Sequence, residues 1–196
     1  MRLPRALRPL RRFTRDSRGA TALEFGLLAM PFLATLCAIF EIAYVNIEGE
    51  MLSAAVSQAS RSMMTGKLQA SNVSSAPDFV SQYLCPSQGR LVPNDFDCSK
   101  LIVDVRPAAD FVSGDLANGF YKSGDNRFCP GAPGQIVVMR VAYPLKAILP
   151  LNLMDSATGG LVNDVPGQSG WFHIVMGEAL FQSEVYTTGF TPPSGC

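Results

Sequence analysis

The sequence predicts an α+β protein in which one long N-terminal helix precedes a small antiparallel sheet. Three observations support this fold class. Residues 20–43 form a nearly uncharged apolar run, and residues 44–68 repeat apolar side chains at helical spacing. The later Val- and Ile-rich segments are separated by Gly and Pro, as is typical of short strands. A chain of 196 residues is long enough for one domain and a membrane segment.

The first 19 residues are strongly basic, although the formal net charge of the chain is zero. They contain seven arginines and one aspartate, whereas the part from Ile47 onward has nine basic and thirteen acidic residues. A basic arm is also typical of nucleic-acid binding, but this one directly adjoins an apolar run. The positive-inside rule therefore predicts a cytoplasmic leader over residues 1–19, with the C-terminal part outside and no nucleic-acid partner.

Residues 20–43 are predicted to be a transmembrane helix. A helix of this length up to Glu41 rises about 32 Å, and the hydrocarbon core of a membrane is about 30 Å thick. A cleaved secretory signal would end in a small-x-small site, which the bulky residues 39–42 do not provide. A lipoprotein signal would have a small residue in place of Leu36 before Cys37. We therefore favour a retained anchor, with Cys37 as a buried thiol.

Glu24 is a carboxylate at the start of this apolar helix. At the level of the lipid headgroups it would simply stay hydrated, because the cost of about 2.5–3.5 kcal/mol applies at the membrane centre. If a peptidase cuts after Gly19, however, Ala20 acquires a cationic α-amino group. That cation would pair best with Glu24 of a neighbouring subunit, and the pairing offsets the burial cost only on assembly. Taken alone, Glu24 is compatible with both interpretations.

The junction resembles the processing site of type IV prepilins: a basic leader, a Gly before the cut and a Glu at the fifth mature position. The residues are Arg18-Gly19-Ala20-Thr21-Ala22-Leu23-Glu24-Phe25. More narrowly, residues 17–66 resemble the TadE-like pseudopilins of tight-adherence (Flp) pilus systems. The further shared features are Pro31 in the apolar run, a small-residue helix through Arg61, Thr65-Gly66, and the strand-like segment Val137–Pro144. Where the family usually ends in Glu-Pro, this chain has Glu184-Val185-Tyr186 and Thr191-Pro192-Pro193.

The resemblance implies a minor pilin-like component of a bacterial adhesion pilus, processed by a prepilin peptidase between Gly19 and Ala20. It also implies that Glu24 and Phe25 act in assembly, with other pilin-like subunits and an inner-membrane pilus platform as partners. The chain would cross the inner membrane once, with its C-terminal domain in the periplasm. Two alternatives remain open. One is an uncleaved anchor that presents a periplasmic binding domain for a secretion system, and the other is a tethered periplasmic enzyme.

Residues 44–68 are predicted to form an amphipathic helical stalk, and residues 69–196 a periplasmic globular domain. The apolar stripe of the stalk consists of Leu52, Ala55, Val56, Ala59 and Met63. This face either packs on the domain of the same chain, as in most amphipathic helices, or receives another helix.

Within the domain, a polar turn is predicted over residues 69–76, followed by a helix that Ser75 caps and that runs to Leu84. Strands are predicted over residues 101–106 and 134–143, and Pro144 is expected to end the second. Residues 171–186 are predicted to form one long strand or a hairpin. The segments 107–133 and 150–170 are predicted to be loops.

Four cysteines lie beyond the predicted membrane segment, at Cys85, Cys98, Cys129 and Cys196. In an oxidising compartment they would form up to two disulfides, and spacing leaves all three connectivities open. Zinc would require CxxC pairs or clustered histidines, and the sequence has neither, so no metal is expected. The only histidine, His173, is interpreted as structural. Without a GxSxG, HExxH or phosphate-loop motif, we expect no enzyme activity, cofactor or small-molecule substrate.

Overall fold

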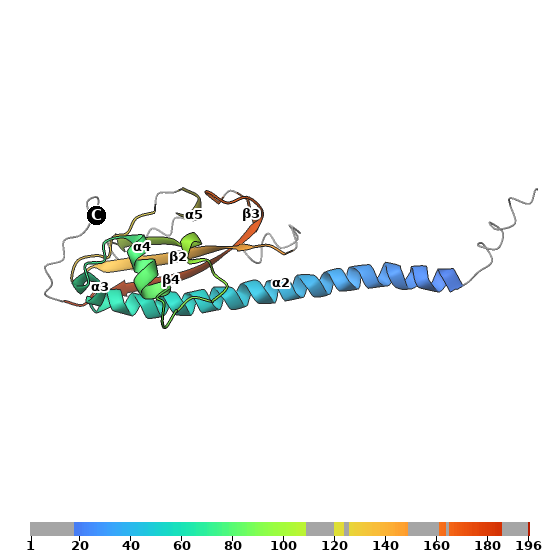
Figure 1. Cartoon of the computed structure of the whole chain (residues 1–196), viewed down its shortest axis with the longest axis horizontal. Coiled ribbons are helices and arrows are strands. Elements are labelled where there is room, and N and C mark those ends of the chain that lie inside the picture. The colour runs from blue at the N-terminus through green and yellow to red at the C-terminus, as the bar shows by residue number, and fades with distance from the viewer. Residues whose placement is uncertain (1–17, 109–119, 124–125, 149–160, 164, 186–195) are drawn as a thin grey trace, which may run out of the picture. The chain divides into compact units, whose positions relative to one another are not determined.

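The computed structural model describes residues 18–108, 120–123, 126–148, 161–163, 165–185 and 196 (Figure 1). The chain divides into two compact units, Met1–Glu41 and Ile42–Cys196. Helix α2 (Arg18–Met64) contributes its first part to one unit and its second part to the other. The α+β class predicted from the sequence is confirmed, because this long helix is followed by a small antiparallel sheet.

In the first unit, α2 exposes apolar side chains all around its surface. Pro31 lies inside the helix, where it cannot donate a backbone hydrogen bond. Its own carbonyl accepts a hydrogen bond from the Thr35 hydroxyl at 2.8 Å, as is common in helices that cross membranes. An 18-residue window reaches a mean hydropathy of 2.0, so this helix is long and apolar enough to span a membrane.

Cys37 is exposed on this helix, so within the described residues no other part of the chain buries its thiol. The surface around it is not covered by other described residues. Only surrounding lipid, or another helix, would bury this side chain. The exposed large apolar side chains of the first unit are Leu23, Phe25, Leu27, Leu28, Met30, Phe32, Leu33, Ile39 and Phe40.

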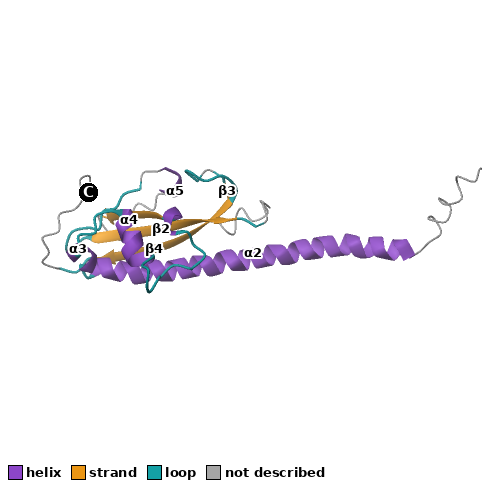
Figure 2. Ribbon diagram, viewed as in Figure 1, coloured by secondary structure: helices purple, strands orange, loops and turns teal. Residues whose placement is uncertain are grey.

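In the second unit, the described strands form one antiparallel sheet in the order β1-β2-β4-β3 (Figure 2). The central strand β2 (Ile136–Lys146) has β1 (Ile102–Ala108) on one side and β4 (Phe172–Gln182) on the other. The short strand β3 (Leu161–Val162) pairs with the beginning of β4. Strand β2 is buried along almost its whole length, and its β-branched residues suit this central position.

The second part of α2 packs on one face of this sheet. All five residues of the predicted stripe are buried. They meet β4 at Gly177, where an added Cβ would lie 2.9 Å from the Leu52 carbonyl oxygen and 2.9 Å from Val56 Cγ2. Glycine is therefore required by the close approach of helix and strand. Of the two interpretations of the stripe, packing on its own domain is confirmed, and this contact leaves no room there for another helix.

Strand β2 does not end at Pro144, so that prediction is wrong. Ile102, the first residue of β1, pairs with Ala142, while β2 continues to Lys146 beside β4. Beyond Ala142 the strand therefore has a described partner on one side only. Pro144 has no backbone N–H to donate, and a strand tolerates such a residue where one of its two sides is unpaired, as on the β1 side here.

The long segment 171–186 contains one strand, β4, rather than a hairpin. The two predicted loops also contain ordered elements, so these predictions are wrong in part. In 107–133, β1 continues to Ala108 and a short helix α5 (Phe120–Ser123) follows, while 150–170 contains β3. Of these two loops, residues 109–119, 124–125, 150–160 and 164 lie outside the described residues.

The connection between α2 and the sheet consists of short helical pieces. The predicted turn over 69–76 begins later than expected, because a short helix α3 (Lys67–Ala70) precedes it. The predicted cap is confirmed, since the Ser75 hydroxyl accepts a hydrogen bond from the Asp78 amide at the start of α4 (Ala76–Phe79). A π-helical turn then continues to Leu84, where the sequence predicted the helix to end.

Candidate functional site

The beginning of α2 carries the residues expected to be processed and to act in assembly. The described part of α2 begins at Arg18, so the bond between Gly19 and Ala20 lies within the helix. Gly19, Ala20, Glu24 and Phe25 are all exposed. Ala20 and Glu24 are four residues apart and therefore lie on the same helix face, one turn from each other. The helix thus places the expected cleavage point and the carboxylate side by side.

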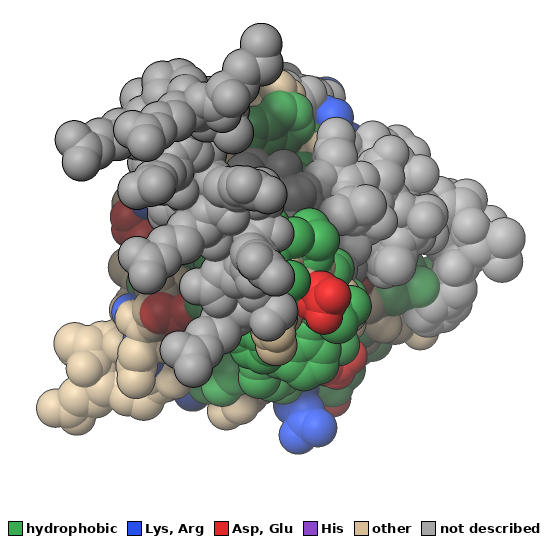
Figure 3. Space-filling model, turned by 90° about the vertical axis from the view of Figure 1, so that its right-hand side faces the viewer, with side chains coloured by type: hydrophobic (Ala, Val, Ile, Leu, Met, Phe, Trp, Pro, Cys, Tyr) green, Lys and Arg blue, Asp and Glu red, His purple; other side chains and the backbone are tan. Residues whose placement is uncertain are grey.

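Glu24 is available to a partner. Among the described residues, no hydrogen bond or ion pair involves its carboxylate. Figure 3 looks at the molecule from the side of the beginning of α2 and shows hydrophobic side chains with a few charged ones among them. The neighbours of Glu24 along α2, Leu23, Phe25, Leu27 and Leu28, are exposed apolar side chains. In a membrane a carboxylate among them would be favoured only near water or near a cation.

A cut after Gly19 would change the electrostatics of this helix end. In an α-helix a carbonyl accepts a hydrogen bond from the amide four residues later, so the cut separates the Arg18 and Gly19 carbonyls from the rest of α2. The new α-ammonium group of Ala20 would add positive charge to a helix end that already carries a positive partial charge. Glu24 is the first acidic residue after the cut. Its carboxylate is therefore the group placed to balance that charge, in its own chain or in a neighbour.

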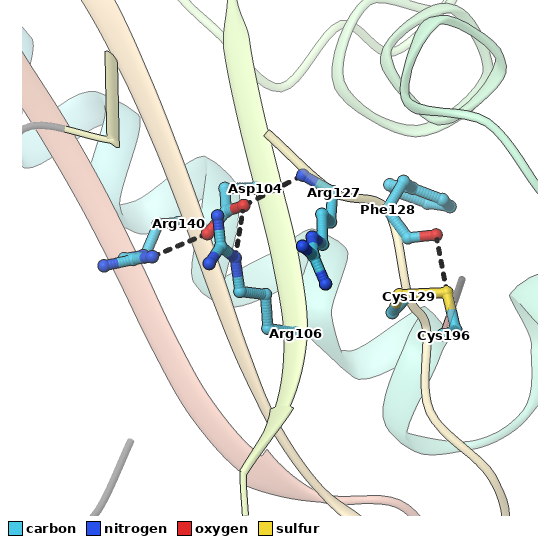
Figure 4. Close-up of polar contacts among 7 residues, drawn as sticks. All are labelled: Asp104, Arg106, Arg127, Phe128, Cys129, Arg140 and Cys196. Atoms are coloured by element: carbon cyan, nitrogen blue, oxygen red, sulfur yellow. Dashed lines mark hydrogen bonds and ion pairs between the residues drawn. A yellow bond between two sulfur atoms is a disulfide. The ribbon is translucent and has the colours of Figure 1, made fainter. Parts of the chain in front are cut away.

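A second polar cluster lies inside the sheet and was not recognised in the sequence (Figure 4). Asp104 of β1 and Arg140 of β2 are cross-strand partners with side chains 1 % and 3 % exposed, and they form an ion pair at 2.6 Å. The other Asp104 oxygen accepts hydrogen bonds from Arg106 Nε at 2.8 Å and from the Arg127 amide at 3.0 Å. The Phe120 ring lies 4.9 Å from the Arg140 guanidinium, as in a cation–π contact.

This cluster has a structural role, because it fastens a chain segment along the free side of β1. The Val105 amide donates to the Arg127 carbonyl at 2.7 Å, and the Cys129 amide donates to the Val105 carbonyl at 2.9 Å. Cys129 is in turn bonded to Cys196, the last residue of the chain. The signal that could have identified the cluster is the presence of opposite charges inside two largely apolar strands, Asp104 in β1 and Arg140 in β2.

A third polar group joins α2 to the loop before β1. The Tyr44 hydroxyl donates to an Asp95 carboxylate oxygen at 2.8 Å. Burial, followed by this hydrogen bond, raises the pKa of Tyr44 to about 12. Glu48, one turn further along α2, is 7 % exposed, and its Oε2 has no partner among the described residues. Burial, followed by the nearby Asp95 charge, raises the pKa of Glu48.

The four cysteines of the second unit lie in two pairs at disulfide distance, Cys85–Cys98 and Cys129–Cys196. Of the three connectivities that spacing left open, the structure therefore has this one. The first pair closes the loop before β1. The second ties the end of the chain to the segment beside β1. Each bridge closes a loop of the folded chain. The bridges also stabilise the fold, because they restrict the conformations open to the unfolded chain.

His173 is buried near the start of β4, between its strand partners Leu145 and Leu161. It lies on the sheet, not in any of the polar clusters described above. Within the described residues, no group of three His, Cys, Asp or Glu side chains is placed to hold a metal ion.

The comparisons with known proteins concern the beginning of α2. Residues 19–61 match the family model of TadE-like proteins. The resemblance inferred from the sequence is thereby confirmed for this segment, and it indicates involvement in the assembly of a tight-adherence pilus. The matched residues begin at Gly19 and include Glu24 and most of the stripe packed on the sheet. No curated protein and no solved structure shows a significant match to the chain.

Proposed function

We propose that this chain, with its TadE-like segment, is a minor pilin-like subunit required to assemble a tight-adherence type IV pilus. A prepilin peptidase cleaves it between Gly19 and Ala20. The observation that carries the proposal is the beginning of α2. There, Glu24 is the only ionisable side chain between Ala20 and Leu36, and it lies one turn from the expected cut. That spacing gives the carboxylate a cation to bind once the leader is removed.

In this function the chain crosses the bacterial inner membrane once. The arginines of residues 1–19 stay in the cytoplasm, in line with the positive-inside rule, and residues 69–196 lie in the periplasm. The two cysteine pairs of that part suit an oxidising compartment. The partners are the peptidase, other pilin-like subunits and the inner-membrane pilus platform.

The peptidase hydrolyses the Gly19–Ala20 bond, leaving a carboxylate on Gly19 and a protonated amine on Ala20. The Ala20 ammonium of one subunit then pairs with Glu24 of a neighbour within the membrane. A single charge in lipid costs more free energy than a charge that is paired with its opposite. The pairing therefore favours assembled subunits in which Ala20 of one chain meets Glu24 of the next. Phe25 adds apolar contact beside the pair. The role is one of assembly, and we propose no catalytic activity for the chain.

The proposal is tested in a strain that assembles these pili and lacks this gene. Wild type restores surface pili, whereas Gly19→Leu and Glu24→Gln do not. The Glu24→Gln chain is still shortened by the peptidase, while the Gly19→Leu chain keeps its leader. Glu50→Gln is the matched control, because Glu50 is an exposed glutamate further along the same helix and its loss leaves assembly intact.

Two results would contradict the proposal in different ways. Normal piliation with Glu24→Gln would refute the pairing role even if the leader is cleaved. Normal piliation with Gly19→Leu, together with an intact leader in wild type, would favour an uncleaved anchor that presents a periplasmic binding domain.

A further inference from the structure

The outer edge of β4 is unpaired over most of its length in the described part of the chain. Strand β3 pairs only with Phe172 and His173, at the beginning of β4. Just past the end of β4, the Glu184 amide donates to the Met64 carbonyl of α2 at 2.9 Å. Between these points, Ile174–Gln182 pairs with β2 on one side and with no described strand on the other. This free edge therefore offers backbone N–H and C=O groups to a further strand.

A groove lies beside the beginning of the free edge. It has a volume of about 260 Å³, and its walls are Ile174–Met176 of β4 and one face of α2. The α2 wall includes Gly49 and Ser53, whose side chains are absent or small. A Cβ built on Gly49 has no atom within 4 Å. A strand added to β4 would therefore find room there for the side chains that it directs toward α2.

The side chains of the free edge alternate between the two faces of the sheet. Gly177 faces α2, so Met176, Glu178 and Leu180 point to the other face. All three are exposed, and Met176 and Leu180 are each 45 % exposed. Lysine and proline, which commonly protect edge strands from pairing, do not occur within Ile174–Gln182. The free edge thus presents two apolar side chains with one carboxylate between them.

The strand register indicates which charge an added strand should carry. Asp104, Arg140 and Glu178 are consecutive cross-strand partners on β1, β2 and β4. Their charges alternate, and Arg140 forms its ion pair with Asp104. Among the described residues, no ion pair involves Glu178 or Glu50, which lies on the α2 wall of the groove. Because opposite charges stabilise neighbouring strands, the next position in this row favours a cation.

A second copy of this chain does not supply that cation. Glu178 is the central residue of the free edge, Ile174–Gln182. If two free edges paired antiparallel over their whole length, Glu178 of one copy would lie directly opposite Glu178 of the other. Like charges in that position destabilise a strand pair. The charge of the edge therefore favours a different protein as the occupant.

We propose that the free edge of β4 binds an extended, basic segment of another protein, which adds to the sheet as an antiparallel strand. The segment carries Lys or Arg opposite Glu178 and apolar residues opposite Met176 and Leu180. The residues between them are small, because α2 approaches the sheet closely at Gly177. Backbone hydrogen bonds supply the affinity in this kind of binding, and the alternate side chains supply the specificity. The inference goes beyond the proposed function and depends neither on cleavage nor on membrane insertion.

The test measures binding of a synthetic peptide to the full chain in detergent micelles by fluorescence anisotropy. The peptide is fluorescein-labelled Thr-Val-Ser-Arg-Ser-Leu-Thr, called here the arginine peptide. Two further peptides have the same sequence with N-methyl groups on one or the other set of alternate amides. Alternate residues of a strand direct their amides to the same side, so only one of the two sets blocks pairing with β4. Wild type is expected to bind the arginine peptide and only one of its methylated forms.

Charge reversal tests the proposed partner chemistry. Glu178→Lys should weaken binding of the arginine peptide by about fivefold. It should strengthen binding of a peptide with glutamate in place of the arginine by a similar factor. Glu184→Lys is the matched control, because Glu184 is an exposed glutamate beyond the free edge. This variant should bind the arginine peptide as wild type does.

Four results would overturn the inference. Wild type that does not bind the arginine peptide has no such site. Equal binding of the two methylated peptides would exclude strand addition. Unchanged affinity of Glu178→Lys for the arginine peptide would contradict the charge match. Sedimentation of the chain without peptide covers the last case, since a dimer that the arginine peptide dissociates would identify a second copy as the occupant.

Discussion

The contact between α2 and the sheet predicts opposite effects for the same substitution at two glycines. Gly177→Ala places a methyl group 2.9 Å from the Leu52 carbonyl oxygen, closer than Cβ atoms normally come to backbone atoms. The helix must then shift away from β4. Gly49 lies on the same helix, and a Cβ built there has no atom within 4 Å. Gly49→Ala therefore adds only the better helix propensity of alanine.

The magnitudes follow from these environments. Overpacking of a core costs about 1–3 kcal/mol, and replacing a glycine in a strand recovers about 0.5–1 kcal/mol. Gly177→Ala should therefore lower the free energy of unfolding by about 1–2 kcal/mol. Gly49→Ala should raise it by about 0.5–1 kcal/mol. In domains of this size each kcal/mol moves the Tm by about 2–4 °C.

The assay is thermal unfolding of the full chain in detergent micelles, followed by Trp171 fluorescence with the disulfides intact. The expected result is a Tm below wild type for Gly177→Ala and above wild type for Gly49→Ala. If Gly177→Ala were as stable as wild type, the close approach of β4 to α2 would be wrong. A fall in Tm for both variants would show that Gly49 has a role that its open surroundings do not explain.

Three further predictions concern the buried polar groups and the C-terminal bridge. Because the pKa of Glu48 is raised on folding, the folded chain holds this proton more tightly than the unfolded chain, and stability falls as pH rises above 4.5. Glu48→Gln should abolish this loss in melts between pH 4 and 8, and Glu50→Gln should retain it. Asp104→Asn removes the buried ion pair between Asp104 and Arg140 and should cost about 3–5 kcal/mol in denaturant unfolding. Replacing Cys129 and Cys196 together by serine should cost about 2–4 kcal/mol in the same assay, and an unchanged midpoint would contradict the proposed tie.

The parts of the fold that depend on local pattern were predictable from the sequence. The apolar run and the stripe after it indicated the long helix, because helical periodicity depends only on neighbours in the chain. Ser75 indicated a helix start through its own side chain. Glu24 was identifiable for the same reason, since its spacing from Gly19 lies within a little more than one helical turn.

The parts that depend on strand register were not predictable in the same way. Pro144 looked like the end of a strand, because the sequence does not show that β1 has already ended on that side. Asp104 and Arg140 lie in different, largely apolar strands, and only the register places them opposite each other. The cysteine pairing depends likewise on which loops the sheet brings together. The burial of Glu48 beside Asp95 could not be predicted either, because it depends on where the loop that carries Asp95 lies against α2.

The central claim is that the apolar helix is made to be cut and then assembled through its new amino terminus. The most direct measurement is the mass and N-terminal sequence of the mature chain, isolated from cells that contain the prepilin peptidase. The account predicts a chain that begins at Ala20 and lacks residues 1–19. A chain that still begins with the arginine-rich leader would contradict the claim, because Glu24 would then have no amino-terminal cation to bind.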